Sequence, residues 1–88
     1  MDLILTSDHI DIALSYNDIR RKYNDVEALN YYNQLLEKFK QTLPSDHLDI
    51  AVTLNNIGLV NYYQNRYKEA LNYYNQSLEI YKKTLPSH

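Results

Sequence analysis

The sequence has no cysteine and no tryptophan, and its 88 residues include one glycine (Gly58) and two prolines (Pro44 and Pro86). Without cysteine the chain can form no disulfide and carry out no thiolate chemistry, which fits a reducing compartment. Because glycine and proline interrupt helices, their scarcity favours long helices with few breaks.

A strong charge of one sign is also missing. Nine basic and eleven acidic residues give a net charge of −2 with the two signs well mixed. This gives no electrostatic reason to expect a nucleic acid or an anionic membrane as partner. The apolar run at the amino terminus is far shorter than the ~7–15 residues of a signal peptide or the ~18 of a membrane span. The sequence therefore predicts a soluble, cytoplasmic protein.

The chain repeats itself. The stretch ALNYYNQLLEKFKQT (28–42) returns as ALNYYNQSLEIYKKT (70–84), 42 residues later, and Leu-Pro-Ser follows it both times. Upstream, Ser7-Asp8-His9 returns as Ser45-Asp46-His47 after 38 residues. The first copy is thus four residues short between Ile19 and Ala28, about one helical turn, so we expect a shortened helix that keeps its apolar face.

Apolar residues fall on one helix face in four stretches, which predicts helices near 9–22, 26–42, 47–63 and 67–83. Asp8 and Asp46 stand at the expected N-cap positions, and each proline follows a predicted helix end. The predicted apolar faces consist of Ile12, Tyr16, Ile19 and Tyr23; Ala28, Tyr32, Leu36 and Phe39; Ile50, Leu54 and Ile57; and Ala70, Tyr74, Leu78 and Tyr81.

The second copy resembles the tetratricopeptide repeat, in which a large residue, Leu-Gly, Tyr, Ala and an aromatic residue recur. The matching residues are Leu54, Ile57, Gly58, Tyr67, Ala70, Tyr74 and Leu78. The 42-residue period and the Leu54-Asn55-Asn56-Ile57 string resemble the longer repeats of kinesin light chains. The resemblance implies an all-α superhelix (solenoid) of two helix-turn-helix pairs, with repeat one at about 7–42 and repeat two at about 45–84. We expect residues 1–88 to form a single domain that is a fragment of a longer array.

Three positions depart from this pattern. Asn61 and Ser77 replace the usual Tyr and Ala, and Arg20 stands where the second copy has Gly58. Small residues such as Gly58 and Ala70 are needed where paired helices cross closely. Arg20 should therefore splay or shift the first pair, making copy one a degenerate repeat that serves as an end cap.

The first helices of such a solenoid line its concave face. Leu54 and Ile57 face the core, which leaves Asn55, Leu59, Tyr62 and Tyr63 towards the groove in copy two. In similar repeats an asparagine of this string holds ligand backbone, which implies that role for Asn55 and, in copy one, for Asn17. A solvated helix surface is the alternative interpretation of both asparagines. The tyrosine pairs at 31–32 and 73–74 are expected to place one ring in the core and one towards the next repeat.

Arg20, Arg21 and Lys22 form the one basic cluster, beside the predicted groove. It would accept an acidic side chain or a peptide carboxyl terminus, or it balances charge at a helix end. His9, His47 and His88 lie one repeat apart, too distant to share a metal, and are expected in the turns between repeats. We predict no catalytic residue, no metal site and no cofactor.

The predicted function is a protein–protein interaction module that binds a peptide segment or a partner protein in the concave groove, as part of a scaffold or cargo-adaptor array. The alternative is a structural repeat that stacks on other repeats without its own ligand. Self-association through the C-terminal helix pair is also predicted, because Leu71, Tyr74, Leu78 and Tyr81 lack a following repeat. An enzyme would require a further domain.

Overall fold

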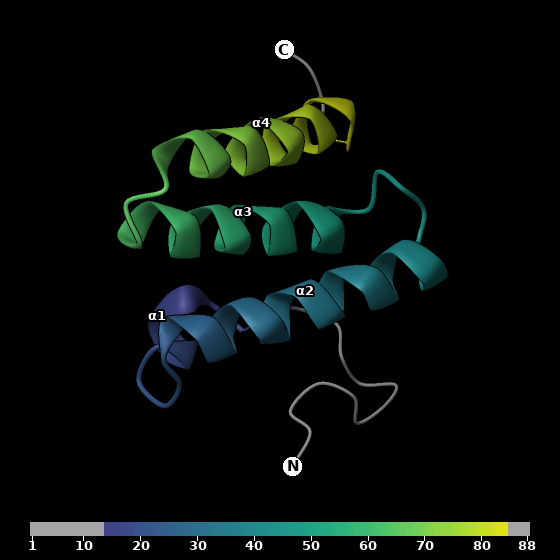
Figure 1. The fold of residues 1–88 in the computed structure, drawn as a ribbon. Helices are drawn as coiled ribbons and strands as arrows, with labels where there is room; N and C mark the ends of the chain where they lie inside the picture. Colours follow the sequence, from purple (N-terminus) through teal and green to yellow (C-terminus); the bar gives the residue numbers. More distant parts are fainter. Residues whose placement is uncertain (1–13, 85–88) are drawn as a thin grey trace.

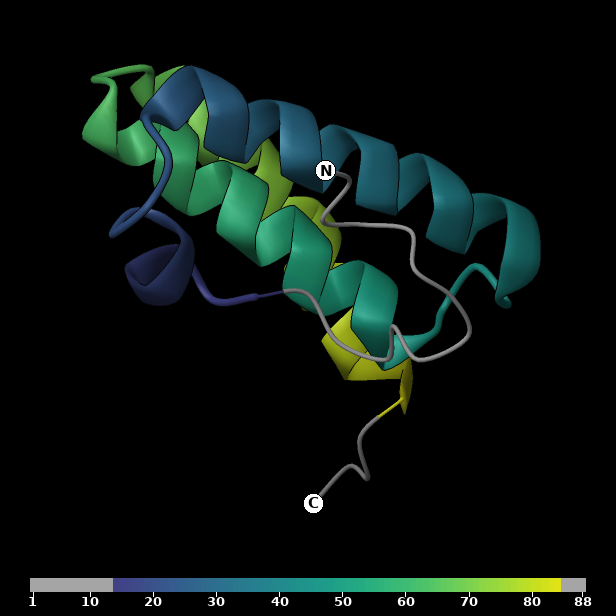
Figure 2. The ribbon, with the colours of Figure 1, turned by 90° about the horizontal axis from the view of Figure 1, so that it is seen from below.

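The computed structural model describes residues 14–84, which form four helices and, within that range, no strand. They are α1 (Tyr16–Ile19), α2 (Asp25–Thr42), α3 (Leu48–Tyr63) and α4 (Tyr67–Thr84). α3 lies between α2 and α4, and the α1–α2 and α3–α4 turns are at the same end of the molecule (Figure 1). Viewed from below, α2 crosses α3 at an angle while α1 lies to the side (Figure 2). This packed all-helical arrangement confirms the predicted fold class.

The boundaries of α2, α3 and α4 agree with the prediction to within one residue at each end, but the predicted first helix, 9–22, is wrong in the described range. Leu14 is not helical, Ser15 is the N-cap, and α1 ends at Ile19. Predicted helical residues 9–13, the Asp8 N-cap and Pro86 lie outside the described residues. Repeat one therefore contributes a single helical turn between residues 14 and 23.

The four-residue deficit explains why α1 ends so early. In copy two, α3 continues past Ile57 to Tyr63 before the chain reverses. In copy one the reversal has to begin directly after Ile19, because Asn24 already caps α2. Residues 20–23 accordingly form tight turns, with the backbone N–H groups of Lys22 and Tyr23 both donating to the Ile19 carbonyl.

The two intra-repeat turns are closed by different capping motifs. In copy one, Asn24 and Glu27 form a reciprocal capping box at the start of α2, which satisfies two otherwise unpaired N–H groups. In copy two, Asn65 adopts a left-handed conformation with φ 65°. Its N–H donates to Tyr62 and that of Arg66 donates to Asn61, the pattern of a Schellman motif that ends α3.

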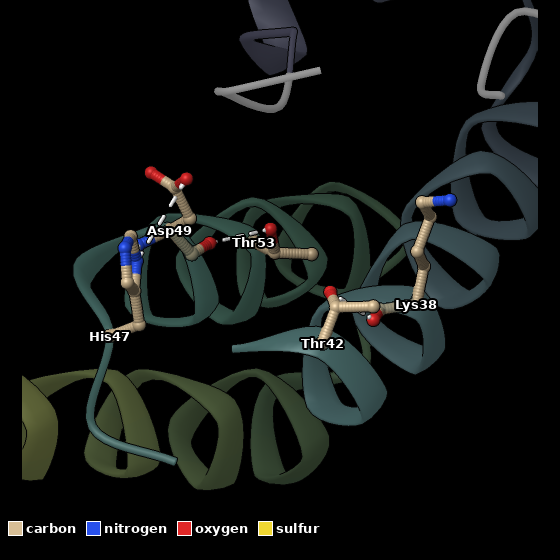
Figure 3. Close-up of polar contacts among 5 residues, drawn as sticks. All are labelled: Lys38, Thr42, His47, Asp49 and Thr53. Carbon is tan, nitrogen blue, oxygen red and sulfur yellow. Dashed lines mark hydrogen bonds and ion pairs between the residues drawn. The ribbon is translucent and has the colours of Figure 1, made fainter. Parts of the chain in front are cut away.

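The turn between the repeats corrects a second prediction, because His47 and not Asp46 is the N-cap of α3. Its Nδ1 accepts a hydrogen bond from the Asp49 backbone N–H at 3.0 Å (Figure 3). The Asp49 carboxylate is also 3.9 Å from this Nδ1, but that pairing needs a protonated Nδ1, which could no longer accept the N–H. His47 thus lies in the turn, as predicted, and Pro44 follows the last residues of α2 as expected.

The predicted contact between small residues in copy two is confirmed. A Cβ placed on Gly58 would lie 2.7 and 2.8 Å from the Cε1 and Cδ1 atoms of Tyr74 and 3.3 Å from the Ala70 carbonyl oxygen. Those first two distances are shorter than carbon atoms tolerate, so the ring of Tyr74 packs directly on the glycine backbone. Leu54, one helical turn before Gly58, and the adjacent Ile57 are buried, as predicted.

The core differs from the prediction on the second helix of each pair. Leu35 is fully buried and Leu36 is half-buried, whereas Leu36 was predicted to face the core. In α4, Leu78 is 49% exposed and Ser77 is buried. The Ser77 hydroxyl donates to the Ala51 carbonyl oxygen at 2.7 Å, so a small polar residue joins α4 to α3 where α2 has a leucine.

The tyrosine pair at 31–32 also corrects the prediction, because both rings are buried in the core. Their hydroxyls form hydrogen bonds to the two polar backbone groups of one residue, Leu14. The Leu14 N–H donates to the Tyr31 hydroxyl at 3.1 Å, and the Tyr32 hydroxyl donates to the Leu14 carbonyl. The chain that enters α1 is therefore held on α2 through its backbone.

Candidate partner-binding surface

Three of the predicted site residues form a row along α3. Asn55, Leu59 and Tyr62 are spaced i, i+4 and i+7, which places them on one helix face. Asn55 is exposed, and within residues 14–84 the α3 side chains that donate hydrogen bonds are Thr53 and Asn61. Leu59 is half-buried and packs against the core, and Tyr62 is 48% exposed. The row thus combines a solvent-facing amide with apolar surface.

The other predicted site residues are on the short first helix and the turn after it. Asn17, Arg20 and Arg21 are all exposed, and α1 contacts α3. Asn17 and Arg21 are four residues apart, while Arg20 is the C-cap of α1 and points towards α3. The structure therefore brings Arg20 to Tyr63 of α3, whereas within residues 14–84 no side-chain hydrogen bond, ion pair or ring contact joins Asn17 or Arg21 to that row.

A cluster of tyrosines joins α1 to the end of α3. The rings of Tyr16 and Tyr63 are stacked, with centroids 5.5 Å apart and an interplanar angle of 23°. The guanidinium carbon of Arg20 lies 5.3 Å from the Tyr16 centroid and 5.4 Å from that of Tyr63. These distances are within the range of cation–π attraction, so Arg20 contacts both rings at once.

Two further rings extend this cluster towards α4. Tyr62 lies edge-on to Tyr63 at 5.3 Å and to Tyr67 at 5.4 Å. The Tyr67 hydroxyl donates to the Asn65 side chain at 2.9 Å, which ties the first residue of α4 to the turn before it. Because Tyr62, Tyr63 and Tyr67 are each about half exposed, these rings form a continuous aromatic surface that solvent and a partner can reach.

Burial and hydrogen bonding fix the inner end of the cluster. Tyr16 is buried, and its hydroxyl donates to the Asp25 Oδ1 atom at 2.6 Å. Burial, then this hydrogen bond and the Asp25 charge, raise the pKa of Tyr16 to about 12. Burial also raises the pKa of Tyr74, with smaller contributions from Tyr62 and Tyr63. Tyr16 is therefore a neutral, immobilised support for Arg20 at physiological pH.

The cationic groups of the surface have no internal carboxylate partner in the described range. Between residues 14 and 84 the one contact within ion-pair distance joins His47 to Asp49, remote in sequence from Arg20 and Arg21. Both arginine side chains are exposed. Their guanidinium groups can accordingly form hydrogen bonds to an external anion without first breaking an ion pair of this range.

The tyrosine cluster shows what the sequence alone did not reveal. The sequence predicted Tyr16 as a core residue and Tyr63 as a groove residue. It did not predict that their rings stack on one another. One local signal was present, because Tyr16 and Arg20 are four residues apart and a helix places such residues on the same face. The partner ring comes from α3, 47 positions further along the chain, and no local pattern specifies that contact.

The structure contains no assembled metal site in the part of the chain that it describes: between residues 14 and 84 no three histidine, aspartate or glutamate side chains come together to hold an ion. Among the helices of that same range, none combines the length and apolar character needed to cross a membrane.

Comparison with known proteins agrees with the helix-pair architecture. The family model of the tetratricopeptide repeat matches residues 11–83, which is most of the chain and includes both copies. Searches of curated proteins and of solved structures found no significant match. The matched residues contain α1, α2 and α3 completely and α4 up to its last residue but one. The chain therefore belongs to the tetratricopeptide repeat family, whose members generally mediate protein–protein interactions.

Proposed function

We propose that this tetratricopeptide chain binds an extended segment of a partner protein on the surface that α1 and α3 share. The observation that carries the proposal is the row of Asn55, Leu59 and Tyr62 on one face of α3, whose Tyr62 ring contacts Tyr63, the ring that Arg20 also contacts. A row that combines an amide, an aliphatic side chain and an aromatic ring offers polar and apolar contacts to one ligand.

Each residue type supplies a different part of peptide recognition. The Asn55 carboxamide has one acceptor and two donors, enough to bond both polar groups of a peptide unit. Asn17 has the same capacity on α1. Leu59 and Tyr62 provide apolar contact, and Arg20 and Arg21 attract acidic groups. Together they suit an extended chain whose backbone is held by amides and whose side chains pack along α3.

The proposal extends to the setting of the module. The 42-residue period and the Leu54-Asn55-Asn56-Ile57 string are similar to repeats of kinesin light chains. This similarity supports a place in a cytoplasmic scaffold or cargo-adaptor array, in which neighbouring repeats lengthen the binding surface. The natural partner would then be another protein, and chemistry would be absent from this domain.

The test replaces Asn55 by alanine and measures binding to a library of uncharged, extended decapeptides by fluorescence anisotropy. We expect the members that bind the native chain to lose about 1–2 kcal/mol of affinity, because hydrogen bonds to the peptide backbone are lost. Helicity measured by circular dichroism should not change, since Asn55 is exposed. Asn72→Ala, which removes an exposed amide from α4, is the matched control. Equal affinities for the Asn55 and Asn72 variants would remove Asn55 from the binding surface.

A second candidate, stacking on another copy or on a further repeat, has its own supporting observation. Leu71 and Leu78 on α4 are 60% and 49% exposed. The residues 42 positions earlier on α2, Leu29 and Leu36, are half-buried against the core. α4 thus presents an apolar stripe at positions whose counterparts on α2 are covered, and uncovered apolar stripes of this kind mark interfaces.

Sedimentation over a wide concentration range tests this candidate. The native chain should associate as its concentration rises, and the double substitution Leu71→Glu with Leu78→Glu should keep it monomeric. Val26→Glu, at an exposed apolar residue on α2, should leave association unchanged. A monomer at every concentration would exclude self-association through α4.

A further inference from the structure

Arg20 has a defined position against the tyrosine cluster. Its guanidinium carbon and the centroids of the Tyr16 and Tyr63 rings are 5.3, 5.4 and 5.5 Å apart, a nearly equilateral triangle. Since the two rings are stacked on one another, the guanidinium is not inserted between them. It lies at nearly the same distance from both rings, and Arg20 is exposed to solvent.

The backbone and the buried ring hold Arg20 in that position. The Arg20 N–H donates to the Tyr16 carbonyl at 3.0 Å, so the two residues are one helical turn apart on the same face. Tyr16 is itself buried and bonded to Asp25. An arginine side chain that is already ordered loses less conformational entropy on binding than a free one. Arg20 is therefore preorganised, unlike the exposed arginine at position 66.

The guanidinium keeps its hydrogen-bonding capacity in this position. Contact with aromatic rings uses the charge of the group but none of its five N–H donors. Between residues 14 and 84 no carboxylate lies within ion-pair distance of Arg20, and the nearby Asp25 already accepts the Tyr16 hydroxyl. The group that complements a planar, cationic fork of donors is a carboxylate, which it binds through two parallel hydrogen bonds.

We infer that Arg20, supported by Tyr16 and Tyr63, receives the carboxylate of an aspartate or glutamate side chain from the bound partner segment. The assignment rests on the proposed function and gives that surface its specificity. The exposed rings of Tyr62 and Tyr63 lie beside this point and cover the methylene groups of the acidic side chain. By displacing water they strengthen the ion pair, because electrostatic attraction rises as the local dielectric falls.

The competing interpretation is that Arg20 merely stabilises the junction of α1 and α3 through its ring contacts. The two roles predict different effects of an Arg20 substitution on ligands with and without a carboxylate. A structural contact would affect every ligand equally, because it would act through the fold. A carboxylate receptor would affect only ligands that carry the carboxylate.

The experiment uses acetylated, amidated decapeptides, each with one central glutamate, and a twin in which glutamine replaces it. Binding of every pair is measured with the native chain, with Arg20→Gln and with Arg66→Gln. Arg66 is an exposed arginine in the α3–α4 turn for which residues 14–84 provide no ring contact. The native chain should bind the glutamate member about tenfold more tightly than its twin. Arg20→Gln should reduce this ratio to about one, whereas Arg66→Gln should preserve it. Circular dichroism melting of each variant shows whether it is folded.

Three results would overturn this assignment alone. If glutamate and glutamine twins bind equally to the native chain, or if Arg20→Gln keeps the ratio of the native chain, the carboxylate does not bind Arg20. If a glutamine twin with a free carboxyl terminus regains the affinity, the ligand is a terminal carboxylate instead of a side chain. These failures leave peptide binding itself intact. No binding by any peptide would overturn the proposed function together with this assignment.

Discussion

The second helices of the two repeats have nearly the same sequence, yet they are buried to different extents. α2 buries five residues, Ala28, Tyr31, Tyr32, Leu35 and Phe39, whereas α4 buries two, Ala70 and Ser77. The difference comes from their neighbours. α2 packs against α3 and also bonds the chain at Leu14. Among the helices within residues 14–84, α4 makes extensive contacts with α3 only.

For the first helices of the two repeats the contrast is in length, and copy two has the longer one. α1 has four residues and α3 has sixteen, although both copies carry the apolar spacing of a helix. The contrast shows that burial along a repeat depends on what lies next to it as much as on its own pattern. Exchanging residues between equivalent positions is the direct way to test this.

The largest effect on the free energy of unfolding is expected at Leu35 and Ser77, which occupy equivalent positions of α2 and α4, when each is replaced by the residue type of the other. Leu35→Ser should lower the free energy of unfolding by about 3–5 kcal/mol, because it leaves a cavity and a buried hydroxyl in the core. Ser77→Leu should also destabilise, by about 1–3 kcal/mol, since the added volume meets the Ala51 backbone. Urea unfolding followed by circular dichroism measures both. A stabilising Ser77→Leu would show that the two sites are equivalent after all.

The next largest effect is expected at the helix crossing. Gly58→Arg gives copy two the residue type that copy one has at the equivalent position, Arg20. The Cβ atom of the new side chain would clash with the Tyr74 ring. We expect a loss of about 3 kcal/mol in unfolding free energy. The reciprocal Arg20→Gly creates no clash and should cost about 1 kcal/mol, from backbone entropy and the lost ring contacts. A loss of only about 1 kcal/mol for Gly58→Arg would mean that the Tyr74 ring can move aside and that this crossing does not require a glycine.

A smaller difference should separate two equivalent tyrosines. Tyr32→Phe removes the hydroxyl bond to the Leu14 carbonyl and should cost about 1–2 kcal/mol in unfolding free energy. Tyr74→Phe removes a hydroxyl that has no hydrogen-bond partner within residues 14–84, and its cost should be close to zero. Thermal melting of both variants gives the comparison. Equal shifts in Tm would show that Leu14 contributes nothing to holding repeat one.

The smallest expected effect is on the response to alkaline pH. The pKa of Tyr16 is raised from 10.0 to about 12 in the folded chain. Its contribution to stability is complete below pH 10 and is lost as the pH rises towards 12, because the unfolded chain releases the proton first. Helicity followed against pH should show less alkaline destabilisation for Tyr16→Phe than for the native chain. Tyr67→Phe, at an exposed ring, should behave like the native chain.

The sequence predicted the fold where the pattern was long and uninterrupted. Periodicity located α2, α3 and α4 to within one residue, and Gly58 identified the crossing of α3 and α4. It failed for the first helix, because the pattern around Ile19 shows apolar spacing but not the need for the chain to reverse within a few residues. Burial of Ser77 in preference to Leu78 depends on the rotation of α4 against α3, which periodicity does not specify.

The candidate site was predicted in part. Exposure of Asn55, Tyr62 and Arg20 follows from their positions relative to buried neighbours, and the structure shows it. Their role in binding remains a prediction. The stacking of Tyr16 on Tyr63 was not foreseen, because it joins residues from different repeats. Asp46 illustrates a local failure, since a strong N-cap residue was passed over in favour of His47 one position later.

The two hydroxyls that bracket Leu14 affect how freely the sequence can vary there. They bond the N–H and the carbonyl of the residue, groups that nineteen amino acids possess in common and that proline alone cannot fully supply. The Leu14 side chain is itself exposed. The fold should therefore tolerate almost any residue at position 14, whereas Tyr31 and Tyr32, which bond its backbone, should not be replaceable without loss of these hydrogen bonds. Substitutions at position 14 should thus leave this residue attached to α2 through its backbone.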